Sequence, residues 1–89
     1  MAAYLANQII MGKLDYTAVI SKYPQYREDI DTILIGQGKQ IIIINSLIIR
    51  IENGILTYTQ AIADYPYLKT DIDEKLIADN KGDLIVPII

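Results

Sequence analysis

The feature that most constrains this chain is an internal repeat with an offset of 42 positions. With that offset, the string GKLDYT of residues 12–17 aligns with GILTYT of residues 54–59. The Tyr-Pro pair that begins at Tyr23 aligns with the pair that begins at Tyr65, and each copy then carries the string Asp-Ile-Asp. Because glycine, proline, tyrosine and aspartate align together in one register, the pattern indicates a tandem duplication.

Each copy is expected to begin with a short helix, at about residues 2–11 and 42–53. Gly12 and Gly54 follow these segments, where a left-handed residue commonly ends a helix. The second segment is rich in isoleucine and alone resembles a strand. Its counterpart in the first copy is a better helix former, so the repeat predicts a helix in both copies.

A second helix in each copy is expected to start after an N-cap, Asp15 or Thr57. Thr57 and Gln60 have the spacing of a capping box, in which each side chain bonds the other residue's amide. The Tyr-Pro pairs end these helices, because the residue before a proline is disfavoured in the α region. Proline then suits the first position of a third helix, expected at 24–35 and 66–78.

These elements predict an all-α fold, a tandem duplication of a three-helix unit that forms one compact helical domain over residues 1–89. Repeat one covers 1–40, repeat two covers 41–82, and an apolar tail covers 83–89. A copy of this size is close to the lower limit for independent folding, so a shared core is expected. A pseudo-two-fold and a translational relation of the copies both remain open.

Composition limits the chemistry that the chain offers. It has no cysteine for a disulfide or thiolate and no histidine, the commonest general base and metal ligand. We therefore predict no enzyme activity, no cofactor and no metal site. The net charge of −3 disfavours nucleic-acid binding, and the longest apolar run is too short to span a membrane. A soluble, non-secreted protein is expected.

The acidic pair Asp29 and Asp31, repeated 42 residues later, is a candidate for binding a cation or a basic partner. The favoured interpretation is a solvated helix face. Arg27 precedes Asp31 by four residues and Lys69 precedes Asp73 by four, which is the spacing of weak surface pairs. Residues two apart on a helix also point in different directions, so one helix does not aim both carboxylates at one ion.

Three further motifs are given structural interpretations. Tyr16, Ile20 and Tyr23 form an apolar stripe that recurs in the second copy, so the rings are expected to pack in the core and the hydroxyls to reach its rim. Residues 79–83 lack the ligands of a calcium loop and are expected to form a polar turn. Residues 36–39 lack the features of a phosphate-binding loop and are expected to link the repeats.

The tail is the predicted interaction segment. No third copy follows it, and a proline blocks helix continuation within it. An unfinished repeat leaves an apolar face that needs a cover, so the tail is expected either to fold back on its own core or to add to another subunit. The residues assigned to this contact are Leu84, Ile85, Val86, Ile88 and Ile89.

The string I-x-x-G-K-L-x-Y-x-x-V-I-x-K-Y-P of residues 9–24, followed by D-I-D-x-x-L-I of residues 29–35, resembles short uncharacterised proteins of clostridial phages and prophages. In that type the stretch often ends in an Asp-Leu-Ile string such as that of residues 83–85. The resemblance covers most of the chain. It implies an origin in a phage or prophage, with a location in the cytoplasm of the host cell or on a virion, and supplies no activity or functional residues.

Two functions are weighed on these grounds. The first is a small non-enzymatic helical protein for interaction or assembly, which forms a homo-oligomer. The alternative is a regulatory module that binds a host protein, or DNA through the helix-turn-helix proportions of its second and third helices. The acidic balance and the scattered lysines and arginines oppose DNA binding.

Overall fold

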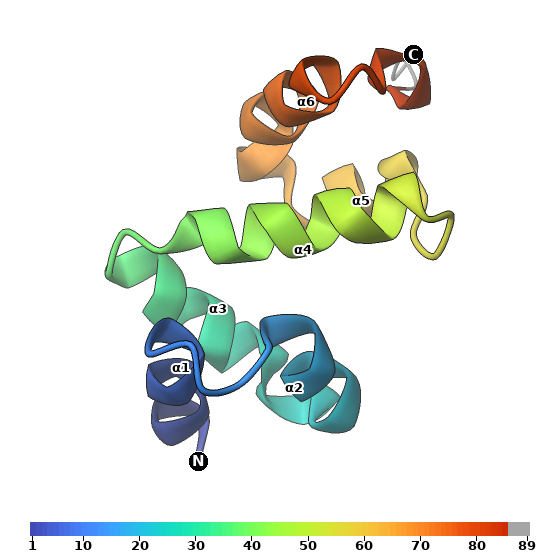
Figure 1. The fold of residues 1–89 in the computed structure, drawn as a ribbon. Coiled ribbons are helices and arrows are strands. Elements are labelled where there is room, and N and C mark those ends of the chain that lie inside the picture. The colour runs from blue at the N-terminus through green and yellow to red at the C-terminus, as the bar shows by residue number, and fades with distance from the viewer. Residues whose placement is uncertain (86–89) are drawn as a thin grey trace. The chain divides into compact units, whose positions relative to one another are not determined.

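The computed structural model describes residues 1–85, and this part of the chain is all-helical, with no strand (Figure 1). The all-α prediction is therefore confirmed for these residues. Contacts within the chain group it into two units, Met1–Ile43 and Ile44–Ile89. Each unit is described by itself below, and a single core shared by both stays a prediction.

The first unit contains three α-helices and one 3₁₀ turn. They are α1 (Ala2–Ile10), α2 (Tyr16–Lys22), η1 (Pro24–Tyr26) and α3 (Arg27–Gly36). After α1 the chain reverses at Gly12, whose φ of 75° lies in the left-handed region that favours glycine. This reversal lets α1 pack against α3, with α2 joining them (Figure 1).

The second unit repeats this order of elements. They are α4 (Gln40–Glu52), whose first residues belong to the first unit, α5 (Tyr58–Asp64), η2 (Pro66–Leu68), α6 (Lys69–Ala78) and η3 (Gly82–Leu84). The helix predicted for the isoleucine-rich run is confirmed by α4. Its burial pattern explains why a β-branched run is helical: the side chains of Leu47, Ile48 and Ile51, spaced three and four apart, are buried.

The third helix of each copy does not run unbroken from its proline, as the sequence predicted. Its first turn is a 3₁₀ helix, in which the Tyr26 amide donates to the Tyr23 carbonyl and the Leu68 amide donates to the Tyr65 carbonyl, both at 3.0 Å. Such i→i−3 bonds are common at helix ends, where the amide groups lack α-helical partners. The α-helices α3 and α6 begin only after this turn.

Both predicted N-caps are confirmed. The Asp15 carboxylate accepts from the Ala18 amide at 3.0 Å, and the Thr57 hydroxyl accepts from the Gln60 amide at 3.1 Å. The predicted capping box is wrong in its second half, because the Gln60 side chain donates to Asp64 at 3.0 Å instead of turning back to Thr57. A side-chain partner one turn ahead on the helix has taken its place.

The buried side chains of the two units correspond at the 42-residue offset. Eight apolar residues buried in the first unit each have a buried apolar counterpart in the second. The pairs are Leu5 and Leu47, Ala6 and Ile48, Ile9 and Ile51, Tyr16 and Tyr58, Val19 and Ala61, Ile20 and Ile62, Ile30 and Ile72, and Leu34 and Leu76. The same positions of the helical order therefore form both apolar cores.

The helix ends correspond in the same way. The Lys13 amide donates to the Gln8 carbonyl and the Ile55 amide to the Arg50 carbonyl, both at 2.9 Å. After the third helices, Gly38 and its counterpart Asn80 both have a positive φ, of 72° and 62°. Asparagine tolerates this left-handed conformation better than most residues, which explains how a non-glycine residue occupies the second position.

Candidate functional site

The acidic residues that the sequence placed on a solvated face are not all exposed. Asp31 is only 6% exposed, and its Oδ1 accepts a 2.6 Å hydrogen bond from the Tyr16 hydroxyl. The surface interpretation was therefore wrong for Asp31, although it holds for the exposed Asp29. The reason is that α2 and α3 bring together two residues that lie 15 positions apart. A hydrogen bond to a charged acceptor contributes about 1.5–3 kcal/mol to stability.

The second unit contains the corresponding pair, and Lys69 lies beside it. The Tyr58 hydroxyl donates to Asp73 Oδ1 at 2.6 Å, and Lys69 Nζ lies 2.7 Å from Asp73 Oδ2. The predicted Lys69–Asp73 pair is therefore confirmed. Burial raises the pKa of Tyr58, and the bond to the Asp73 carboxylate raises it further. The phenol therefore stays neutral and donates the hydrogen bond, and the Tyr58–Asp73 pair links α5 to α6.

These pairs also correct the interpretation of the tyrosine stripe. The rings of Tyr16 and Tyr58 are buried, as expected from their place on the stripe. Their hydroxyls do not reach a rim, since each donates to an aspartate between two helices. Among residues 1–85, no three histidine, cysteine, aspartate or glutamate side chains gather to hold a metal ion.

A second acidic contact has no counterpart in the first unit. Glu52, at the end of α4, hydrogen-bonds through its side chain with Asp79, which follows α6. The bond between two carboxyl groups needs a proton, so it raises the pKa of Glu52, and burial and the charge of Asp79 add to the shift. The residues at the matching positions of the first unit are Ile10 and Gln37, so this proton-dependent contact belongs to the second unit alone.

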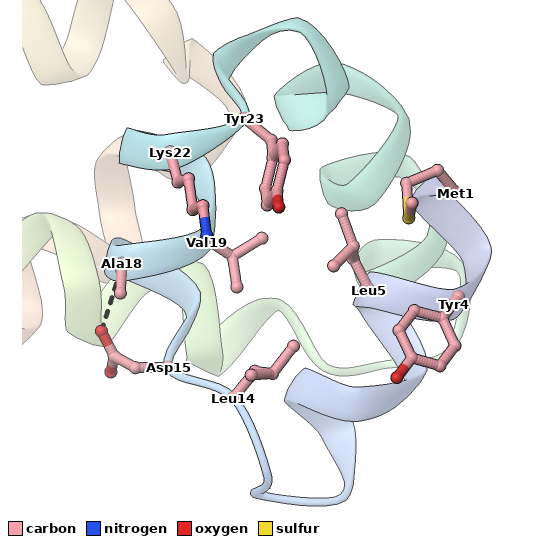
Figure 2. Close-up of a pocket in the computed structure, with 9 residues that line it drawn as sticks. All are labelled: Met1, Tyr4, Leu5, Leu14, Asp15, Ala18, Val19, Lys22 and Tyr23. Carbon is pink, nitrogen blue, oxygen red and sulfur yellow. Dashed lines mark hydrogen bonds between the residues drawn. The ribbon is translucent and has the colours of Figure 1, made fainter.

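An apolar groove of about 350 Å³ lies in the first unit between α1 and α2 (Figure 2). Figure 2 shows Leu5 and Val19 on the facing sides of this space, with Tyr4 on the side of α1 and Tyr23 on the side of α2. The residues that line it are Met1, Tyr4, Leu5, Leu14, Asp15, Ala18, Val19, Lys22 and Tyr23. The groove thus combines aliphatic and aromatic side chains with few charged groups, as binding sites commonly do.

Three large apolar side chains at this groove are open to solvent. Met1 is 69% exposed, Tyr4 is 61% exposed and Leu14 is 39% exposed. Single exposed apolar residues are ordinary, but several that line one hollow form a surface suited to an apolar partner.

The charged groups of the groove have distinct roles. The Asp15 carboxylate caps α2 through the Ala18 amide, so it already has a partner (dashed line in Figure 2). The Lys22 ammonium lies 5.4 Å from the centre of the Tyr23 ring, within the range of a cation–π contact. Lys22 is exposed and places a positive charge at one side of the groove.

The predicted interaction residues lie elsewhere. Leu84 ends η3 and Ile85 follows it, and both are half-buried in the second unit. The Ile85 amide donates to the Gly82 carbonyl at 3.1 Å, and η3 packs against α6. Val86, Ile88 and Ile89 lie outside the described residues, so their part in an interaction stays a prediction.

The groove was not predicted from the sequence, because the predicted features are those that the two copies share. At the groove the copies differ: Tyr4 and Lys22 correspond to Ser46 and Asp64. A signal was present in that difference: Tyr4 is exposed whereas its counterpart Ser46 is buried, and a position that differs in this way can acquire a function in one copy alone.

Comparisons with known proteins add no relative, because no family model, no curated protein and no solved structure matches the chain. The resemblance to phage and prophage proteins stays a prediction. In residues 1–85, none of the helices has both the length and the apolar character needed to cross a membrane.

Proposed function

We propose that this chain is a non-enzymatic interaction protein, built by duplication of one helical unit, that self-associates through the groove of its first unit. Duplication is supported by the sequence repeat, by the eight matched pairs of buried residues and by the matched helix ends. An origin in a phage or prophage, and a place in the host cytoplasm or on a virion, fit the resemblance in the sequence.

The observation that carries the proposed function is the apolar groove with its exposed Met1, Tyr4 and Leu14. Burial of apolar surface contributes about 25 cal/mol per Å², so covering these side chains favours association. A second copy is the partner that the chain itself offers, since residues 84–89 are largely apolar and suit such a surface.

The remaining polar residues favour a structural role over catalysis. Asp31 and Asp73, which the sequence singled out, accept hydrogen bonds from buried tyrosines and fasten helices together. Their carboxylates stabilise the helix pairs instead of opening onto the groove, which is lined mainly by apolar side chains.

The DNA-binding alternative is disfavoured by the charge on the third helices. A recognition helix contacts bases with its N-terminal residues. In α3 the first turn carries Glu28 and Asp29, and in α6 it carries Asp71. These exposed carboxylates would repel phosphates, so the surface favours a protein partner.

Sedimentation equilibrium of the full chain tests the proposed function. Tyr4→Gln removes an aromatic side chain that is 61% exposed at the groove, and Ile49→Gln removes an apolar one that is 59% exposed on α4. The two variants are matched in exposure and in the polar residue introduced, and glutamine is a good helix former.

We expect the wild-type chain and Ile49→Gln to associate equally, and Tyr4→Gln to associate at least about fivefold more weakly, as for loss of an interface hot spot. A wild-type chain that stays monomeric at the highest attainable concentration would overturn the proposed function. Equal weakening by both variants would place the contact outside the groove and overturn it as well.

A further inference from the structure

We infer that the groove of the first unit is occupied by residues 86–89 of a second copy, with Asp83, which is exposed in η3, paired to Lys22. This inference rests on the proposed self-association and names the segment that performs it. Asp83 is followed by the half-buried Leu84 and Ile85 and then by the apolar string Val-Pro-Ile-Ile. The groove has apolar walls with one exposed lysine at its side.

The size of the groove favours a short segment over a whole helix. A volume of about 350 Å³ lies near the lower end of the range of roughly 300–1,000 Å³ for small-ligand sites. Such a volume holds a few side chains and is too small to receive a second helix. Residues 86–89 supply a short run without a charged side chain.

The aromatic residues of the groove match the proline of the segment. Tyr4 and Tyr23 stand on opposite sides of the hollow in Figure 2, and aromatic-lined grooves are the usual receptors for extended proline-containing peptides. The proline of the segment is Pro87.

The charge at position 22 favours the first unit over the second as the binding site for the segment. Lys22 is complementary to Asp83, whereas its counterpart 42 residues later is Asp64, which would repel it. Tyr4 is likewise replaced by Ser46, which has no ring. Because the whole chain carries a net charge of −3, a lysine beside the groove also offsets repulsion between two copies locally.

A charge exchange in the full chain tests the pairing. We expect Lys22→Glu and Asp83→Lys each to weaken association about two- to fivefold, the range of an exposed ion pair, and the double variant to recover most of the loss. The matched control is Asp83→Lys combined with Lys13→Glu, a lysine of the first unit that does not line the groove, which should show no recovery. Additive losses in the Lys22 and Asp83 double variant would overturn the pairing.

A mixing experiment tests whether the segment comes from a second copy. The full-length variant carrying Val86→Asn and Ile88→Asn keeps an intact groove, and Tyr4→Gln keeps an intact segment. We expect each alone to be largely monomeric and an equal mixture to form a mixed dimer, weaker than the wild type because it contains one groove-to-segment contact instead of two.

The outcomes separate this inference from the proposed function. Undiminished association of the Val86→Asn, Ile88→Asn variant would overturn the inference while leaving groove-mediated association in place. A mixture that stays monomeric while the wild type associates would overturn exchange between copies. A monomeric wild type in which the segment substitutions shift the amide signals of Tyr4 and Lys22 would mean that the segment binds within its own chain, which overturns both proposals.

Discussion

Removal of the Tyr16 hydroxyl isolates the contribution of the tyrosine–aspartate pair to the first unit. The change Tyr16→Phe keeps the buried ring and deletes only the donor that lies 2.6 Å from Asp31 Oδ1. A hydrogen bond to a charged group contributes about 1.5–3 kcal/mol. Because Asp31 is 6% exposed and water reaches it poorly, the loss should lie near the upper end, at about 2–3 kcal/mol.

Tyr58→Phe is the matched comparison in the second unit. The Asp73 side chain is 20% exposed, so water compensates more of the lost bond there than at the buried Asp31. We expect this variant to lose about 1–1.5 kcal/mol, less than Tyr16→Phe. In a domain of this size 1 kcal/mol corresponds to a Tm shift of roughly 4–8 °C, so the two variants are separable in a thermal melt.

Urea unfolding followed by circular dichroism measures both losses. The free energies are comparable only if the denaturant slope stays that of the wild type, which also checks for separate unfolding of the two units. A loss below about 0.5 kcal/mol in Tyr16→Phe would refute the assignment of a buried, stabilising bond. A larger loss in Tyr58→Phe than in Tyr16→Phe would refute the reasoning from burial.

Two further predictions concern pH and backbone conformation. Since the pKa of Glu52 is raised above its ordinary value of 4.5, its contribution to stability is fully present below that pH and is lost as pH rises through the raised pKa. In thermal melts across this pH interval, the Tm of Glu52→Gln should change less with pH than the Tm of the wild type. An equal change of Tm with pH in both proteins would contradict the Asp79 contact. Gly12→Ala should destabilise the chain by about 1 kcal/mol in urea unfolding, because alanine is strained at φ 75°. Gly36 lies in α3, and a Cβ added there has no atom within 4 Å, so Gly36→Ala should stabilise the chain by about 0.4–1 kcal/mol. A Gly12→Ala variant more stable than Gly36→Ala would count against the turn assignment.

The sequence predicted the features that depend on residues close together in the chain. Asp15 and Thr57 cap their helices because a short polar side chain reaches an amide three residues ahead. Gly12 and Gly54 end helices because both have a positive φ, of 75° and 74°. The helix of α4 was predictable only through comparison with its counterpart, since its isoleucines alone favour a strand.

The features that the sequence did not predict depend on contacts between distant residues. The bond from Tyr16 to Asp31 joins positions on two helices, and helical periodicity alone placed Asp31 on the surface. The groove likewise depends on how α1 faces α2, with Tyr4 and Lys22 brought to one hollow by packing. Positions that match at the 42-residue offset build the apolar cores, whereas Tyr4 and Lys22 of the groove differ from the residues 42 positions later.

The most direct test of the central claim is an NMR dilution series of the full wild-type chain. If the groove of the first unit is the self-association surface, the amide signals of Tyr4, Ala18 and Lys22 should shift with concentration. The signals of their counterparts Ser46, Gln60 and Asp64 serve as the internal control and should stay constant. Shifts confined to the second set, or constant signals throughout both sets, would contradict the account.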